Sequence, residues 1–296
     1  MEITFLGTSS MVPTSDRNHS AVLLKYKKEN ILIDCGEGTQ RQFRIAKISP
    51  AKLTKLLISH WHGDHVLGIP GLMQTLIANH YTNKLEIYGP KGSKKNFKKM
   101  LEAFEIRGQM IDYEVIEVKE EKIFEDENFI LEAYQLEHGN CLGYSFIEKD
   151  RFKIKKSYLK KIGLKSNPIL KDLQKGKAIT WKGKKIKVKD ATSVVKGKKI
   201  CFVADTKKCE NIVRMCKGAD LMISEATLMH DLVKVADERN HLTGVQAAEL
   251  AKKAKVEKLI LTHFSQRYKD VRALVAESKK VFKNVKAAKD FMKISV

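Results

Sequence analysis

His60-Trp61-His62-Gly63-Asp64-His65 is the stretch of sequence that decides the fold, and it follows the apolar run Leu56-Leu57-Ile58-Ser59 directly. Three histidines and an aspartate within six positions are hard to explain as structural residues, because each would have to be buried or hydrated at the end of a strand. Imidazole nitrogens and carboxylate oxygens are ligands that zinc and similar metal ions prefer. We expect His60 and His62 to converge on one metal ion, and Asp64 and His65 to reach a second.

Three further candidate ligands follow apolar runs elsewhere in the chain, and they are His138, Asp205 and His263. With the four residues of the cluster they make seven ligands. Seven is the right number for two metal ions that share a bridging carboxylate and keep an open position for water. The sequence therefore predicts a two-metal site. We expect Asp34 to support this site through hydrogen bonds to its surroundings.

Short apolar runs ended by turn residues predict strands, and they alternate with helical patterns in both halves of the chain. The predicted strands are 3–6, 21–24, 30–33, 56–59, 85–88, 200–203, 221–223 and 259–261. The predicted helices are 68–79, 211–216 and 244–255, the last with Thr243 as its amino-terminal cap. This alternation predicts a layered α/β domain rather than a helix bundle or a pure β-sandwich.

Positive charge is concentrated in one segment. The 296 residues include 56 Lys and Arg against 35 Asp and Glu, a formal net charge of +21. Residues 149–189 contain sixteen Lys or Arg and two Asp, which leaves +14 of that charge in this segment. Such a one-sided block repels itself unless an anion binds to it, and nucleic acid is the favoured partner. A solubilising or assembly surface is the alternative interpretation.

We predict that this lysine-rich segment, at about 149–190, is an arm that projects from a single domain spanning residues 1–296. Phe152, Tyr158 and Trp181 lie among its lysines. Its apolar content is thin for the core of a separate domain.

Composition excludes several classes of protein. Hydrophobic residues make up 43% of the chain, which is enough for a substantial core. The apolar runs are far shorter than the ~18 residues that a membrane span needs, and no secretion signal is visible. The five cysteines form no C-x-x-C pair, which disfavours a disulfide framework. We therefore expect a cytoplasmic protein with no membrane partner.

The pattern His-x-His-x-Asp-His, followed by isolated His, Asp and His residues, resembles the metallo-β-lactamase superfamily, whose fold is a four-layer αββα sandwich. Within that superfamily the chain is similar to the ribonuclease Z family of tRNA 3′-processing endoribonucleases. Two further stretches carry the likeness, Asp34-Cys35-Gly36-Glu37-Gly38-Thr39-Gln40 and His263-Phe264-Ser265-Gln266-Arg267-Tyr268. The resemblance covers essentially the whole chain.

The resemblance implies a role for each candidate residue of the site. One zinc ion would be bound by His60, His62 and His138, a second by Asp64, His65 and His263, with Asp205 bridging them. Asp64 would also position and deprotonate the attacking water, and a purely structural role is the alternative. Glu225 and His241 correspond to the pair that assists the leaving group.

The resemblance also implies contacts with the substrate. The predicted substrate-binding residues are Arg17, Asn18, Lys155, Lys156, Lys160, Lys161 and Arg267. A phosphate contact and a buried ion pair are both open for Arg267. At four positions the chain departs from the family pattern, with Ser15 for Lys, Asn167 for Gly, Ser224 for His and Leu242 for Ser.

The function implied by the resemblance is removal of the 3′ trailer from precursor tRNA, which leaves a tRNA 3′-OH and a 5′-phosphorylated trailer. Water activated by two Zn²⁺ ions would attack the phosphodiester, and Mn²⁺ or Mg²⁺ are possible substitutes. Family members usually work as homodimers, so a homodimer is expected.

Three alternatives remain open from the residues alone. A small-molecule phosphodiesterase, or a thioester or lactam hydrolase of the same fold, would keep the metal site and change the substrate. A β-CASP-type RNA exonuclease is the second alternative, although the chain is short for the domain inserted in those enzymes. An RNA-binding protein with a degenerate metal site is the third.

Overall fold

The computed structural model describes residues 1–106 and 110–296. The chain divides into two compact units. The first unit comprises Met1–Phe124, Leu131–Phe146 and Lys199–Val296, and the second comprises Glu125–Ile130 and Ile147–Lys198.

The first of two large sheets has seven strands in the order β18-β1-β2-β3-β4-β5-β6. Its strands are β1 (Glu2–Gly7), β2 (Ala21–Tyr26), β3 (Glu29–Ile33), β4 (Lys55–Leu57), β5 (Leu85–Gly89), β6 (Tyr113–Glu117) and β18 (Lys293–Ser295). The strands from β3 to β6 are parallel to their neighbours. Their carboxyl ends therefore share one edge of the sheet, where the segment after β4 begins.

The second sheet also has seven strands, in the order β17-β16-β15-β14-β9-β8-β7. Its strands are β7 (Glu121–Glu125), β8 (Phe129–Leu136), β9 (Cys141–Glu148), β14 (Lys199–Val203), β15 (Leu221–Glu225), β16 (Leu259–Thr262) and β17 (Val285–Ala287). The run from β14 to β17 is parallel. Asp205, Glu225 and His263 consequently lie together at or just beyond the carboxyl ends of three neighbouring strands.

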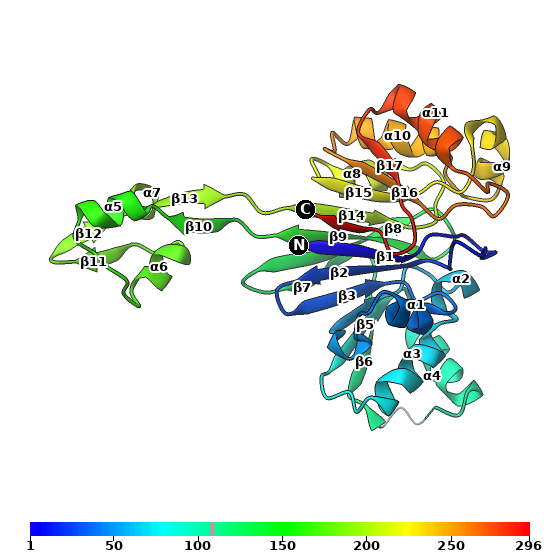
Figure 1. Cartoon of the computed structure of the whole chain (residues 1–296), viewed down its shortest axis with the longest axis horizontal. Helices are drawn as coiled ribbons and strands as arrows, with labels where there is room; N and C mark the ends of the chain where they lie inside the picture. The colour runs from blue at the N-terminus through cyan, green and yellow to red at the C-terminus, as the bar shows by residue number, and fades with distance from the viewer. Residues whose placement is uncertain (107–109) are drawn as a thin grey trace. The chain divides into compact units, whose positions relative to one another are not determined.

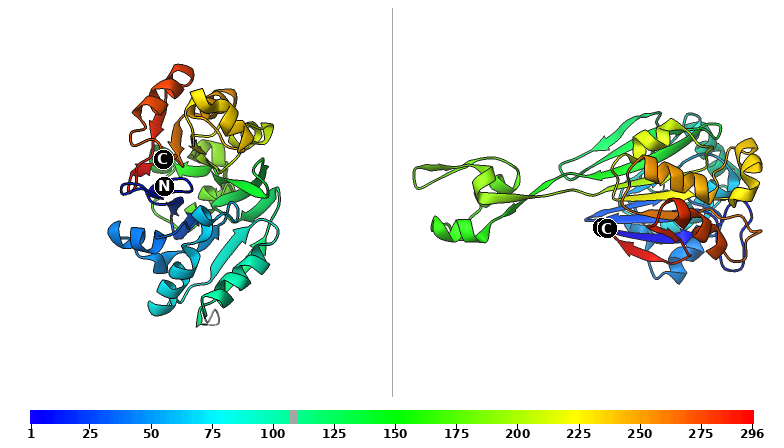
Figure 2. Two further views of the ribbon diagram at one scale, coloured as in Figure 1. Left: turned by 90° about the vertical axis from the view of Figure 1, so that its right-hand side faces the viewer. Right: turned by 90° about the horizontal axis from the view of Figure 1, so that it is seen from above.

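Helices cover the outer face of each sheet in the first unit (Figure 1 and Figure 2). The first sheet is covered by α1 (Thr39–Ile45), α3 (Ile69–Ala78) and α4 (Ser93–Ala103), and the second by α8 (Glu210–Cys216), α10 (Gly244–Lys253) and α11 (Arg272–Val281). Successive residues of a strand point to opposite faces of the sheet. Leu23 of β2 packs in the core between sheet and helices, whereas its buried neighbours Val22 and Leu24 are not part of that core. This is the four-layer αββα sandwich that the family resemblance implies.

The two sheets pack face to face through apolar and aromatic side chains. Tyr26 of β2 and Phe146 of β9 meet edge to face, with ring centroids 5.2 Å apart. Tyr144 is fully buried and its hydroxyl donates to the carbonyl oxygen of Ile58 at 2.7 Å. This hydrogen bond satisfies the polar end of a buried aromatic ring and fixes the strands that carry the site.

The eight predicted strands and three predicted helices are all present, with ends shifted by at most two residues. Thr243 caps α10 as predicted, because its hydroxyl accepts from the Gln246 backbone N–H and the Gln246 side chain accepts from the Thr243 N–H. The sequence analysis missed several elements, including β7 and α4. Both consist largely of charged residues with few large apolar ones, so no apolar run marks them in the sequence.

The second unit has a small core of its own. Two antiparallel strand pairs belong to this unit, β10 (Arg151–Ile154) with β13 (Thr192–Val195) and the hairpin of β11 (Ile179–Trp181) and β12 (Lys184–Ile186). Three short helices complete the unit, α5 (Lys156–Lys161), α6 (Leu170–Gln174) and α7 (Val188–Ala191). The buried cluster consists of Leu159, Leu164, Leu173, Ile179, Ile186 and Ala191. The segment thus gathers more apolar surface than its composition indicated, and the unit extends beyond the range of about 149–190.

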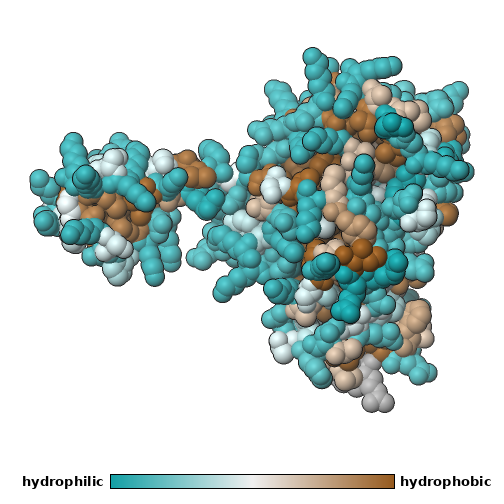
Figure 3. All heavy atoms as spheres, viewed as in Figure 1, coloured by the Kyte–Doolittle hydropathy of each residue, from teal (hydrophilic) through white to brown (hydrophobic). Residues whose placement is uncertain are grey.

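The surface in the view of Figure 3 is predominantly hydrophilic. Large apolar side chains that remain exposed include the adjacent Met11 and Val12, at 58% and 44% exposure. No helix within residues 1–106 and 110–296 has both the length and the apolar character to cross a bilayer.

Candidate metal centre

The seven predicted metal ligands meet at the carboxyl-terminal edges of the two sheets. They follow β4 (His60, His62, Asp64 and His65), β8 (His138), β14 (Asp205) and β16 (His263). Gly36 allows the loop after β3 to pass close to the helix that carries Asp64, since a Cβ at this position would lie 2.4 Å from the Asp64 carbonyl oxygen.

The donor atoms form two groups, within each of which all atoms lie within 4.8 Å of one another. The first group is His60, His62, His138 and Asp205, and the second is Asp64, His65, Asp205 and His263. Asp205 belongs to both groups. The structure therefore brings all seven residues together, with one carboxylate between the two sets.

Orphaned polar atoms in this cluster test whether metal ions fit. Among the described residues, Asp64 Oδ1, Asp205 Oδ1 and His65 Nε2 are buried without a hydrogen-bond partner. Asp205 Oδ1 lies 3.3 Å from His263 Nε2, but the angles do not make a hydrogen bond. Such atoms are costly to bury unless a cation compensates them. The mixture of imidazole and carboxylate donors is the set that divalent transition metals take, so the residues fit metal ions.

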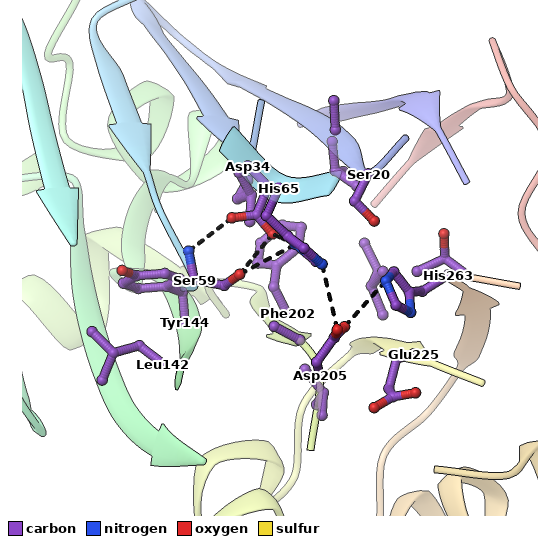
Figure 4. A pocket seen from close by; sticks show the side chains of 17 residues that line it. Ser20, Asp34, Ser59, His65, Leu142, Tyr144, Phe202, Asp205, Glu225 and His263 are labelled. Atoms are coloured by element: carbon purple, nitrogen blue, oxygen red, sulfur yellow. Dashed lines mark hydrogen bonds and ion pairs between the residues drawn. The ribbon is translucent and has the colours of Figure 1, made fainter. Parts of the chain in front are cut away.

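Hydrogen bonds orient His65 and His60, two of the three histidines that follow β4, and Figure 4 shows those among His65, Asp34 and Ser59. His65 donates from Nδ1 to Asp34 Oδ2 at 2.7 Å, and the Ser59 hydroxyl donates to the same oxygen at 2.9 Å. Since that hydroxyl proton is engaged, Ser59 Oγ accepts from His60 Nδ1, which lies 3.0 Å away. Both imidazoles thereby present Nε2 to the centre. Asp34 has the supporting role that was expected of it.

The same arrangement holds for two ligands of the second sheet. His138 donates from Nδ1 to the Asn240 carbonyl oxygen at 2.8 Å. The Thr227 hydroxyl donates to Glu225 Oε2 at 2.6 Å and lies 3.0 Å from His263 Nδ1, from which it accepts. Nε2 of both histidines is again left for the centre.

Charges in the cluster favour a bound cation. Burial, assisted by repulsion from His65, lowers the pKa of His60 to about 2 and so keeps its imidazole neutral, as a metal ligand requires. Burial also lowers the pKa of His65, but the carboxylates of Asp205 and Asp34 outweigh it and raise that pKa well above its usual value. The carboxylate field thus attracts positive charge, either a proton or a metal ion, to this position.

Glu225 and His241 form a pair beside the metal-binding groups. His241 Nδ1 lies 3.1 Å from Glu225 Oε1 and 4.0 Å from Asp205 Oδ2. Burial lowers the pKa of His241, but the Glu225 carboxylate outweighs it and raises this pKa to about 9. Divalent cations at the neighbouring groups would oppose that rise by charge repulsion. The pair can hold a proton at the edge of the centre.

An open cleft of about 310 Å³ gives access to the centre. Its lining includes His241, Arg239, Arg267 and the exposed apolar pair Met11 and Val12. Two cations and an apolar edge at the mouth suit a nucleotide, which carries a phosphate and an apolar base face.

The predicted substrate-binding residues of the first unit have different surroundings. Arg267 lines the cleft and its Nε donates to Ser265 Oγ at 3.2 Å. Arg17 donates from Nη2 to the carbonyl oxygens of Ser265 and Tyr268, at 3.3 and 2.7 Å, and thus holds the loop that carries Arg267. Asn18 donates from Nδ2 to the Glu37 carbonyl oxygen at 2.7 Å.

The four predicted lysines lie in the second unit, at the end of β10 and along α5. They are Lys155, Lys156, Lys160 and Lys161, and all four are exposed. Lys155 Nζ donates to the Lys189 carbonyl oxygen at 3.2 Å.

Sequence reasoning missed three residues of the centre, Thr227, Asn240 and Arg239. Thr227 lies in the stretch Ser224-Glu225-Ala226-Thr227, so its motif could have indicated it. Asn240 acts through its backbone carbonyl, and Arg239 reaches the cleft only through the fold, so neither leaves a sequence signal.

Two family models match the chain. The model described as Anti-Pycsar protein Apyc1 matches residues 1–164, and the Beta-lactamase superfamily domain matches residues 175–264.

Curated relatives and solved structures align over the whole chain. Ribonuclease Z from Methanosarcina mazei is 37% identical over 303 residues, covering 100% of this chain and 98% of the relative. Ribonuclease Z from Chlamydia muridarum is 38% identical over 296 residues, covering 98% of this chain and 95% of the relative. The crystal structure of human tRNase Z, short form, superposes with a TM-score of 0.73 at 30% identity, covering 100% of this chain and 99% of that one.

Proposed function

The chain belongs to the ribonuclease Z family of the metallo-β-lactamase fold, and from this premise we propose that it removes the 3′ trailer of precursor tRNA as a zinc enzyme. It is a metal-dependent phosphodiester hydrolase. The observation that carries the function is the end-to-end alignment with ribonuclease Z relatives, which includes the lysine-rich segment.

We assign two Zn²⁺ ions to the centre, for which Mn²⁺ or Mg²⁺ can substitute. When bound, such ions lower the pKa of water and neutralise charge on the phosphate oxygens. The residues that would hold them are His60, His62 and His138 for one ion, Asp64, His65 and His263 for the other, and Asp205 for both. The unpaired oxygens of Asp64 and Asp205 support this assignment.

Asp64 and His241 divide the proton transfers between them. Asp64 positions the attacking water and accepts its proton on the carboxylate. His241 donates a proton from Nε2 to the departing 3′-oxygen of the upstream nucleotide, while Glu225 holds Nδ1 at 3.1 Å. The products are tRNA with a free 3′-OH and a trailer with a 5′-phosphate.

The exposed lysines of the second unit supply contacts to tRNA phosphates that do not depend on sequence. We propose a homodimer in which the second unit of one subunit holds tRNA for its partner, and a cytoplasmic location where precursor tRNA is available. The family resemblance and the charge of this segment support these proposals.

A small-molecule phosphodiesterase of the same fold is the second candidate. The match to the Anti-Pycsar protein Apyc1 family over residues 1–164 supports this candidate. It means that this part of the chain resembles a family other than ribonuclease Z. The full-length relatives and the concentration of lysines outside the metal site favour tRNA.

The test is cleavage of an end-labelled precursor tRNA that carries a 3′ trailer, with the cut mapped to the nucleotide. We expect a metal-dependent cut at the 3′ end of the tRNA that is lost with chelator and in Asp64→Ala. RNA that binds but stays intact with Zn²⁺ or Mn²⁺ supplied would remove the endonuclease assignment.

A further inference from the structure

A second opening of about 450 Å³, the side groove, adjoins the metal centre. It shares His62 and His138 with the cleft that contains His241, so the two openings meet at the first metal-binding group. The other side chains of the groove come from the segments after β4, β5 and β8 and from the residue before His241, and they include Trp61, Lys91, Asn96, Asn140 and Asn240.

The chemistry of this lining suits a nucleotide chain. It offers an ammonium group, three carboxamides and an indole, and none of its described lining residues is a carboxylate. Within the described parts of the chain, the Lys91 ammonium and the Asn96 amide make no hydrogen bond or ion pair, so both are available to a ligand. An unpaired cation beside neutral amides attracts a phosphate and can bond to a base edge.

Two hydrogen bonds make the groove rigid. The indole N–H of Trp61 donates to Ser93 Oγ at 2.8 Å, which fixes the ring against the start of α4. Asn140 donates from Nδ2 to the Lys91 carbonyl oxygen at 2.9 Å, which ties the loop after β8 to the loop that carries Lys91. A fixed aromatic ring is a platform on which a base of any identity can stack.

The position of His241 decides which side of the substrate enters each opening. His241 lines the first cleft and is absent from the side groove. As the proton donor to the departing 3′-oxygen, it must face the upstream nucleotide, which places the tRNA end in the first cleft. The downstream chain stays bonded to the same phosphorus through its 5′-oxygen and needs another path, for which the adjoining groove is open.

We propose that the side groove binds the first nucleotides of the 3′ trailer, with Lys91 on a phosphate beyond the scissile one, Asn96 on a base edge and Trp61 stacked against a base. This inference rests on the proposed function, because it takes the direction of the chain from His241.

The test compares Lys91→Ala and Asn96→Ala with Lys95→Ala in the metal-loaded full chain. Lys95 is an exposed residue of α4 outside the groove lining. Lys95→Ala therefore lowers the net charge by the same amount as Lys91→Ala without changing the groove. Precursor tRNAs with trailers of one and ten nucleotides are cleaved, since only the longer one has phosphates beyond the scissile one.

We expect Lys91→Ala to lower kcat/KM about tenfold on the long trailer and less than twofold on the short one. Lys91→Arg should retain activity.

Binding measured without turnover gives a second readout. A 5′-phosphorylated ribotetranucleotide is added to a Trp181→Phe protein, in which Trp61 is the remaining tryptophan of two. We expect the tetranucleotide to quench the fluorescence of Trp61. We expect Lys91→Ala to weaken tetranucleotide binding, while its affinity for mature tRNA stays within twofold of the wild type.

Two outcomes would overturn the inference while the proposed function stands. One is equal loss on both trailer lengths, and the other is weakened binding of mature tRNA in Lys91→Ala. If the wild-type protein cut no precursor tRNA but bound the tetranucleotide, the proposed function would fall by itself.

Discussion

Asp205 is the residue on which both metal-binding groups depend. Its two carboxylate oxygens face both groups, as Oδ2 lies 3.8 Å from His60 Nε2 of the first group and Oδ1 lies 3.3 Å from His263 Nε2 of the second. Asp205 is only 3% exposed, so water cannot solvate its negative charge. A buried carboxylate in this place is stable when cations lie on both sides.

Replacing Asp205 by Asn should remove this shared charge. We expect metal content to fall below two ions per chain and cleavage to drop more than about 100-fold, since partners that only orient metal ligands are already worth 10–100-fold. Elemental analysis and precursor tRNA cleavage measure the two effects. Asp231→Asn, at an exposed carboxylate, is the control. Full metal content with normal cleavage in Asp205→Asn would contradict the bridging role.

His241 is expected to act on the leaving oxygen alone. His241→Gln should lower kcat for precursor tRNA by about 10²–10⁴-fold, as removal of a general acid does, and leave metal content unchanged. Bis(p-nitrophenyl) phosphate needs no proton on its leaving group, so its hydrolysis should change little. An equal loss on both substrates would indicate that His241 serves the metal centre instead.

At the level of secondary-structure elements, the ends of strands and the starts of helices position the residues of the site. β14, β15 and β16 are parallel neighbours, so three residues distant in sequence, Asp205, Glu225 and His263, end up adjacent. His263 has φ of 59°, a left-handed backbone that is unfavourable for a residue with a Cβ. Such strain persists where the surrounding structure fixes it, as at this site.

The capping box of α10 anchors this helix two residues after His241. Thr243→Ala should destabilise the protein by about 1 kcal/mol, because the first turn loses its hydroxyl acceptor. In a domain of this size the loss corresponds to roughly 2–4 °C in Tm, measured by thermal unfolding. Thr243→Ser keeps the acceptor and should unfold close to the wild type. No difference between the Ala and Ser variants would mean that the cap contributes nothing.

At the scale of the whole molecule, the metal centre and the densest run of lysines lie in different compact units. The first unit contains the metal centre, and the second, with 18 Lys or Arg against 7 Asp or Glu, contributes +11 of the formal net charge of +21. The apolar cluster of the second unit is separate from the clusters of the first. Each unit can therefore be altered without removing the core of the other.

Deleting residues 155–191 tests this separation. Ile154 and Thr192 are cross-strand partners, so a short Gly-Ser turn can join them. We expect the affinity for precursor tRNA to fall at least about tenfold and its salt dependence to flatten, because phosphate contacts are lost. Hydrolysis of bis(p-nitrophenyl) phosphate should stay within twofold. Unchanged tRNA affinity would assign the lysines to solubility or assembly.

Residue spacing and apolar runs alone predict the ligand types, eight of the strands and a layered α/β fold, while the four-layer order followed from the family resemblance. The spacing of the ligands from His60 to His65 indicates a metal site without knowledge of the fold. The apolar runs before Asp205 and His263 likewise predict buried strands, whichever strands they pair with. These features are local, because spacing and alternation are properties of the chain before it folds.

How the centre is held and reached follows from the packing of distant segments against one another. Thr227 orients His263, the Asn240 carbonyl orients His138, and Arg239 reaches the cleft, each through contacts between segments far apart in sequence. Arg17, predicted to bind substrate, donates to carbonyl oxygens of the loop that carries Arg267, a contact that no local pattern indicates. Hydrogen-bond partners depend on which strand ends become neighbours, and sheet order sets that only when the whole chain has packed.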